Sequence, residues 1–150
     1  MPDEFHARYS AKGKLYEYRL LNRSERPAVD RRHCWHIYKP LNDAAMNQAT
    51  MALIGSHDFS SFENQPTENI DPVCHLQRLA VYREGDQLRI EAYADRFLKQ
   101  MVRSIVGTLV EVGLGKRLPD SLTEILDARD RSAAGKTAPP HGLFLIRVDY

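Results

Sequence analysis

The chain of 150 residues has little cysteine and no long apolar run. Its two cysteines, Cys34 and Cys74, are too few for the disulfide framework of a small secreted domain. No stretch reaches the roughly 18 apolar residues that a transmembrane helix needs. The first residues include Asp3 and Glu4, which a signal peptide would not carry there. We therefore expect a soluble, cytosolic protein that does not associate with membranes.

The chain also has little net charge, because 21 basic and 20 acidic side chains leave +1. The charges are nevertheless segregated: the balance is +4 over residues 1–40, −6 over 41–95 and +4 over 96–117. Two basic segments that met in space would form a polyanion site, although an ordinary solvated surface explains the same numbers. The length and the 43% of hydrophobic residues favour one domain with its own core.

Alternation and periodicity predict an α+β fold. Strands are predicted over residues 14–21, 34–38, 76–83, 87–94 and 143–149, with a hairpin turn at 84–86. Helices are predicted over residues 43–54 and 97–112, with a shorter one from Pro119, and the segments 63–71 and 131–142 are predicted to be loops. This order predicts a single domain, residues 1–150, in which an antiparallel sheet carries helices on one face.

The most apolar of these helices contains an arginine that has no obvious partner. The apolar residues between Phe97 and Val112 lie nearly all round this helix, so we expect it to be buried on most sides. Arg103 lies near its middle, where an unpaired guanidinium is costly, and no residue three or four positions away is acidic. Its partner must come from elsewhere in the fold, from a ligand or from another chain, unless Arg103 faces solvent. Gly107, one turn further on, would let another backbone approach closely.

Four segments of the sequence occur in an order and spacing typical of a known family. They are FHARYSA with GKLYEYR (residues 5–19), GSHDFSSF (55–62), FLKQMVRSIVGTL (97–109), and DRS with APPHGL (130–143). Each segment is modest evidence alone. Together they cover the whole chain, which resembles the bacterial tRNA pseudouridine synthase A family.

The resemblance implies an enzyme that converts uridine to pseudouridine in the anticodon stem-loop of tRNA, with no cofactor and no metal. The family nucleophile is an aspartate in an R-T-D-x-G-V-type motif, which this sequence lacks. The chain therefore resembles the C-terminal half of the enzyme, and we expect it to be inactive alone. The implied partners are tRNA, the missing N-terminal domain and a second copy in a homodimer. The alternative is a non-catalytic RNA-binding or dimerisation domain.

Five residues match family positions with implied roles. Tyr16 matches the tyrosine that stacks on the target base after it leaves the helical stack. Arg103 matches the arginine that pairs with the catalytic aspartate, which would supply its missing partner. Arg8 is expected to contact a backbone phosphate. Lys14 is a further phosphate candidate, although an ordinary solvated surface charge is the simpler interpretation of it. His6 fits packing or hydrogen bonding equally well.

Other candidates receive structural interpretations. Tyr18 is expected to be an ordinary sheet aromatic. Asp58 is rejected as a substitute nucleophile, because the resemblance implies a structural turn there. The scattered histidines and cysteines fit no closed zinc pattern. The sequence departs from the family pattern at Cys74, where an arginine is frequent, and at Arg96, where a glycine is common.

Overall fold

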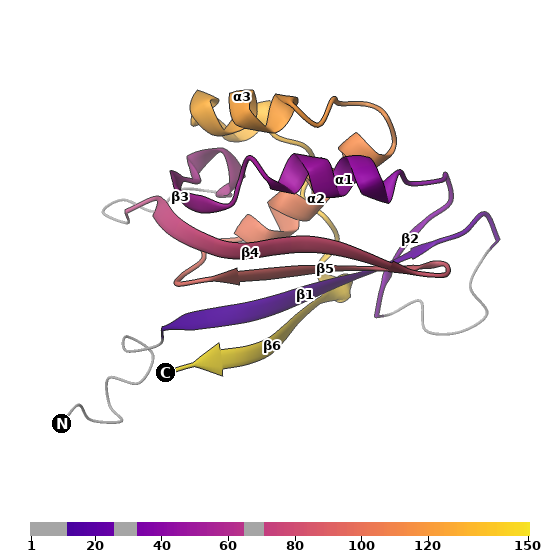
Figure 1. Ribbon diagram of the computed structural model, residues 1–150, viewed down its shortest axis with the longest axis horizontal. Helices are drawn as coiled ribbons and strands as arrows, with labels where there is room; N and C mark the ends of the chain where they lie inside the picture. Colours follow the sequence, from indigo (N-terminus) through magenta and orange to yellow (C-terminus); the bar gives the residue numbers. More distant parts are fainter. Residues whose placement is uncertain (1–11, 26–32, 65–70) are drawn as a thin grey trace.

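The computed structural model describes residues 12–25, 33–64 and 71–150, which form one mixed sheet with helices packed on it (Figure 1). Within this part of the chain the strands are β1 (Gly13–Asn22), β2 (Trp35–Ile37), β3 (Gly55–Asp58), β4 (Val73–Glu84), β5 (Gln87–Ala94) and β6 (Leu143–Asp149). The α-helices are α1 (Asp43–Thr50), α2 (Met101–Gly113) and α3 (Ser121–Ala128). All three helices lie on the same side of the sheet (Figure 1), so the predicted α+β arrangement is confirmed.

The order of strands across the sheet is β2-β1-β5-β4-β3. The first part of β1 also pairs with β6 and its last part with β2, so these two strands share the edge of β1 opposite β5. Every pairing is antiparallel except that of β1 with β2. The sequence did not predict this parallel pair. It is possible because about a dozen residues separate the two strands, enough chain to return to the start of a parallel neighbour.

The sequence did not predict the strand β3, and it extended the preceding helix to residue 54. The helix α1 instead ends at Thr50. The backbone of Gly55 has a φ of +116°, which glycine adopts readily, and the chain then enters β3 against β4. A four-residue polar strand at a sheet edge carries too little hydrophobic alternation to be recognised.

The core lies between the sheet and the helices, with α2 at its centre. Eleven of the 13 residues of α2 are buried. Leu122, Ile125 and Leu126 of α3 are buried as well. Within the described residues, no helix is both long and apolar enough to cross a bilayer.

The helix α2 begins four residues later than the sequence predicted. Gln100 has a φ of 58°, a left-handed conformation that separates Phe97 and Leu98 from the first helical residue, Met101. Leu98 is buried in the core. Phe97 contacts Tyr16 on β1, with ring centroids 5.0 Å apart and a T-shaped arrangement. The apolar character of this segment therefore reflects packing beside the helix as well as within it.

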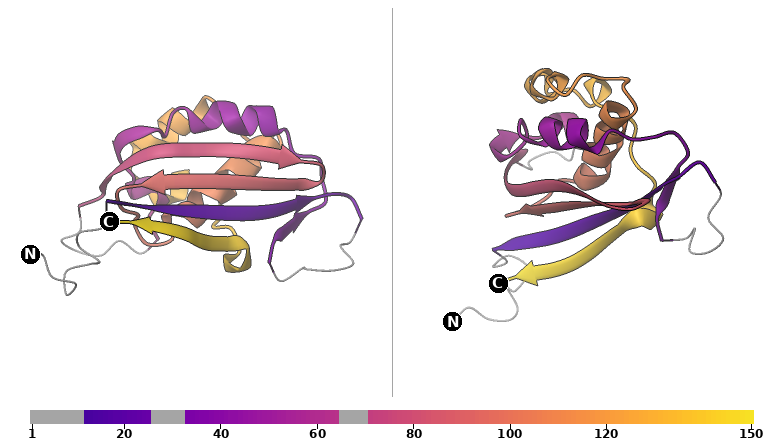
Figure 2. Two further views of the ribbon diagram at one scale, coloured as in Figure 1. Left: turned by 60° about the horizontal axis from the view of Figure 1, so that its bottom comes forward. Right: turned by 45° about the vertical axis from the view of Figure 1, so that its right-hand side comes forward.

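The opposite face of the sheet is not covered by the described helices (Figure 2). Alternating charges cross it from β4 through β5 to β1. The ion pairs are Arg78–Glu91 at 3.2 Å, Arg89–Glu91 at 3.4 Å, Arg89–Glu17 at 3.7 Å and Arg19–Glu17 at 2.7 Å. The charged residues at alternate positions of the strands thus form a ladder on this open face.

Candidate active site

Tyr16 lies on the helix-facing side of β1. Strand alternation places Lys14, Tyr16 and Tyr18 on this side, while Glu17 points to the open face. The side chain of Tyr16 is half-buried against Phe97, and this burial raises the pKa of its phenol above the ordinary value. Tyr16 is therefore a neutral ring, part of which remains accessible to a stacking partner.

Arg103 lies on α2 and is half-buried. Its Nε donates a hydrogen bond to the carbonyl oxygen of Ala138 at 2.8 Å, and the Ala138 N–H donates to the Arg103 carbonyl at 3.0 Å. None of the ion pairs between described residues includes Arg103. Its hydrogen bond to Ala138 is made by Nε and not by the terminal Nη groups.

The side chains of Tyr18 and Arg103 meet at two neighbouring carbonyls. The Tyr18 hydroxyl donates to the Pro139 oxygen at 2.5 Å, while Arg103 uses the oxygen of Ala138. Because Tyr16 is two residues from Tyr18 on the same side of β1, the structure brings Tyr16 and Arg103 into one region of the molecule.

The segment that provides these carbonyls, residues 134–140, is here called the strap. It runs along α2 so closely that a Cβ at Gly107 would lie 1.6 Å from the carbonyl oxygen of Lys136. The prediction that Gly107 admits another backbone is confirmed. Further along, the Gly135 N–H donates to Thr108 Oγ1 at 2.9 Å and the Lys136 N–H donates to Glu111 Oε2 at 3.1 Å. The strap is thus fixed along two turns of α2.

Glu111 joins the strap to α2 and also accepts a hydrogen bond from Arg117 Nε at 2.7 Å. Burial alone would raise the pKa of Glu111, but the Arg117 side chain and the Lys136 N–H outweigh it. The pKa therefore lies below its ordinary value. A carboxyl group with a lowered pKa in the folded state stabilises the fold above its unfolded pKa, and loses that contribution as the pH falls through the folded pKa.

We expect Glu111→Gln to reduce the free energy of unfolding by about 1 kcal/mol at pH 7, because charged hydrogen bonds become neutral ones. The difference from the unchanged chain should shrink as the pH falls below the ordinary pKa of a glutamate and through the lowered pKa of Glu111, because the carboxyl group then becomes protonated. Urea unfolding at several pH values measures both effects. A difference that stays constant down to pH 3 would contradict this role of Glu111.

The other predicted residues are less informative. His6 and Arg8 lie outside the described residues. Lys14 is half-buried on the same side of β1 as Tyr16. Asp58 is confirmed as a turn residue, because its Oδ1 accepts hydrogen bonds from the Ser60 N–H at 2.9 Å and the Ser60 hydroxyl at 2.5 Å.

The two departures from the family pattern lie next to each other. Arg96 Nη1 donates to the carbonyl oxygen of Val73 at 2.5 Å and is 3.8 Å from Cys74 Sγ. Burial raises the pKa of the Cys74 thiol to about 11. The guanidinium of Arg96 therefore lies beside Cys74, which is a neutral thiol that packs in the core.

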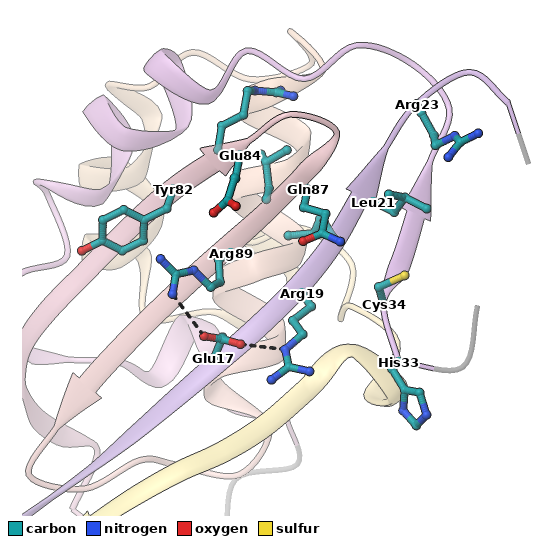
Figure 3. Close-up of a pocket in the computed structure, with 13 residues that line it drawn as sticks. Glu17, Arg19, Leu21, Arg23, His33, Cys34, Tyr82, Glu84, Gln87 and Arg89 are labelled. Atoms are coloured by element: carbon teal, nitrogen blue, oxygen red, sulfur yellow. Dashed lines mark hydrogen bonds and ion pairs between the residues drawn. The ribbon is translucent and has the colours of Figure 1, made fainter. Parts of the chain in front are cut away.

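A cavity of about 810 Å³ lies on the open face (Figure 3), and its lining includes neither Tyr16 nor Arg103. Glu17 lies on its floor between Arg19 and Arg89 (Figure 3). Its other walls come from the end of β1, from the hairpin formed by the end of β4 and the start of β5, and from His33 and Cys34. Sequence reasoning missed this cavity, although the alternating charges of β1 and β5 were a usable signal. In residues 12–25, 33–64 and 71–150, no group of three or more His, Cys, Asp and Glu side chains is arranged to hold a metal ion.

Comparison with known proteins gives consistent matches. The profile of the tRNA pseudouridine synthase family matches residues 49–150. Proteins named tRNA pseudouridine synthase A are 47% identical in Thermoanaerobacter sp. (strain X514), 43% in Bartonella quintana and 48% in Halalkalibacterium halodurans. These matches cover 99%, 100% and 95% of the chain, but 61%, 61% and 54% of the relatives. The chain thus spans little more than half of each relative, and it belongs to the tRNA pseudouridine synthase family.

Proposed function

We propose that the chain is the C-terminal domain of a tRNA pseudouridine synthase that acts on the anticodon stem-loop in the cytoplasm. In this proposal Tyr16 stacks on the flipped uridine, and Arg103 holds the catalytic aspartate ionised and aimed. The aspartate comes from an N-terminal domain, which corresponds to the part of the relatives that the chain does not span. His6, Arg8 and Lys14 contact the RNA.

The observation that carries the proposal is the state of Arg103. It lies half-buried on a mostly apolar helix and pairs with no carboxylate among the described residues. One protein carbonyl satisfies Nε and leaves the Nη groups available. A guanidinium without a carboxylate partner in its own domain can bind a carboxylate from another domain. The two groups would then form two parallel hydrogen bonds.

The edge strand β6 supports a second domain as partner. Leu145 and Ile146 are 52% and 47% exposed there. Of the described strands, only β1 pairs with β6, so its other edge offers backbone groups to a further strand. Exposed apolar side chains on an open strand edge are typical of a surface that another element covers.

A chimaera tests the proposal. The chain would replace the aligned part of the Thermoanaerobacter relative, and both the chimaera and the chain alone would be incubated with tRNA that carries tritium at uridine C5. Pseudouridine formation joins the sugar to C5 and releases that tritium. We expect release by the chimaera and none by the chain alone. Turnover by the chain alone, or a folded chimaera without turnover, would contradict the proposal.

The second candidate is a non-catalytic domain that binds RNA or forms a homodimer. The open face of the sheet and its charge ladder favour this candidate. It predicts that the chain alone binds tRNA with an affinity that falls with salt, or that it sediments as a dimer. The chimaera separates the two candidates, because only the enzyme proposal requires tritium release.

A further inference from the structure

We infer that Tyr18 is a positioning residue, which orients the guanidinium of Arg103 through the carbonyls of Ala138 and Pro139. The catalytic consequence of this inference rests on the proposed function. The orientation itself does not, because it concerns contacts within the described chain. The sequence had indicated only an ordinary sheet aromatic at this position.

The Tyr18 hydroxyl is a fixed and permanent donor. The side chain is 0% exposed, and burial raises the pKa of its phenol well above the ordinary value, so the hydroxyl keeps its proton at any physiological pH. Its hydrogen bond to the Pro139 oxygen is 2.5 Å long. A ring with no exposed surface cannot stack on RNA, which separates its role from the one proposed for Tyr16.

The ring of Tyr18 is itself held in place. A Cβ at Gly142 would lie 2.8 Å from ring atoms Cε1 and Cζ, so glycine is needed where the chain passes over the ring. Trp35 of β2 contacts the ring at a centroid distance of 6.3 Å in a T-shaped arrangement. The position of the hydroxyl is therefore set by the sheet and by the start of β6.

The strap couples the position of the Tyr18 hydroxyl to that of Arg103, because the backbone of the strap is restricted. Pro139 and Pro140 restrict its backbone, and a residue that precedes a proline is confined to extended conformations, which applies to Ala138. The carbonyls of Ala138 and Pro139 belong to consecutive residues, so fixing one restricts the other. Arg103 is also bound by the strap's backbone, because the Ala138 N–H donates to the Arg103 carbonyl.

The hydrogen bond from Arg103 Nε to the Ala138 oxygen determines the direction in which the guanidinium points. The guanidinium is planar, so a hydrogen bond at Nε fixes the plane in which both Nη groups point. A carboxylate partner requires that plane for two parallel hydrogen bonds. Without the Tyr18 hydroxyl, the strap would move more freely, the Ala138 oxygen would leave Nε more often, and the Nη groups would sample other directions.

The test begins with the full 150-residue chain alone. Hydrogen exchange of the Arg103 Nε–H, followed by NMR, reports how often Nε loses its acceptor. We expect Tyr18→Phe to accelerate this exchange about five- to tenfold, the factor that corresponds to one net hydrogen bond. The control is Thr50→Val, which removes the buried hydroxyl bonded to the Asn47 carbonyl and should leave the exchange of Arg103 unchanged. An unchanged rate in folded Tyr18→Phe overturns the inference.

A second variant keeps the test decisive if Tyr18→Phe does not fold. Thr137→Ala loosens the same strap from its other side, because Thr137 Oγ1 lies 2.9 Å from Arg131 Nη2 and 3.1 Å from Asn64 Nδ2. It should accelerate the same exchange, and an unchanged rate overturns the inference.

Turnover of the chimaera extends the test to catalysis. We expect Tyr18→Phe to lower kcat about five- to tenfold with KM for tRNA unchanged, and to have no further effect when Arg103 is already lysine. Multiplicative effects of the two changes would show an ordinary structural role and overturn the inference. If the unchanged chimaera shows no turnover, the proposed function fails, while NMR exchange still decides the position of Arg103.

Discussion

Replacing Arg103 with alanine is expected to lower the turnover of the assembled synthase by about 10²–10³-fold, the usual effect of removing one preorganised charged group from a reacting centre. The affinity for tRNA should change little, since the guanidinium is proposed to face a protein carboxylate and not a phosphate. Single-turnover tritium release measures the first effect, and filter binding of tRNA measures the second.

The variant should remain folded, so a loss of activity would be interpretable. Arg103 is half-buried, and within the described residues its side chain forms one hydrogen bond, to Ala138, whose loss costs about 1 kcal/mol. Arg103→Lys is the matched comparison: it keeps the charge but removes the planar fork, so we expect a rate between those of the unchanged protein and the alanine variant. A folded alanine variant with an unchanged rate would remove Arg103 from the site.

Much of the fold follows from local patterns in the sequence. The alternation in β4 and β5 and the turn between them predicted the hairpin, and the apolar run predicted α2. Arg103 was singled out because a charge in that helix lacked a local partner, and the absence of an ion pair within the described residues agrees with this interpretation. The catalytic roles of Arg103 and Tyr16 stay predictions.

Other features depend on contacts between residues far apart in the chain. Tyr18 and Pro139 are 121 positions apart, and no pattern around either residue indicates that they are bonded. The sequence predicted a loop over the strap because these residues have no periodicity of their own. The strap is held in place by its contacts with α2. The parallel pairing of β1 with β2 and the cavity on the open face likewise arise only when the sheet has assembled.

The replacement of Gly107 with alanine is expected to destabilise the chain by about 3 kcal/mol or more, at the upper end of typical overpacking effects. In an open helix the same change would stabilise by about 1 kcal/mol, because alanine is the better helix former. The sign is reversed here since the added Cβ would lie 1.6 Å from the Lys136 carbonyl oxygen, which is backbone and cannot move aside as a side-chain end would. The strap would have to leave α2, and its hydrogen bonds to Arg103 and Thr108 would be lost with it.

Gly115→Ala provides the comparison just beyond the end of α2. A Cβ there meets nothing within 4 Å, although the φ of +81° makes alanine unfavourable by about 1–2 kcal/mol. Urea unfolding should therefore show a larger loss for Gly107→Ala than for Gly115→Ala. In the chimaera, Gly107→Ala should also slow turnover under conditions in which the variant is fully folded, because the Ala138 carbonyl no longer fixes Arg103, whereas Gly115→Ala should not. A Gly107→Ala variant as stable as the unchanged chain would mean that the strap does not lie against α2 in solution, and the orientation proposed for Arg103 would fall with it.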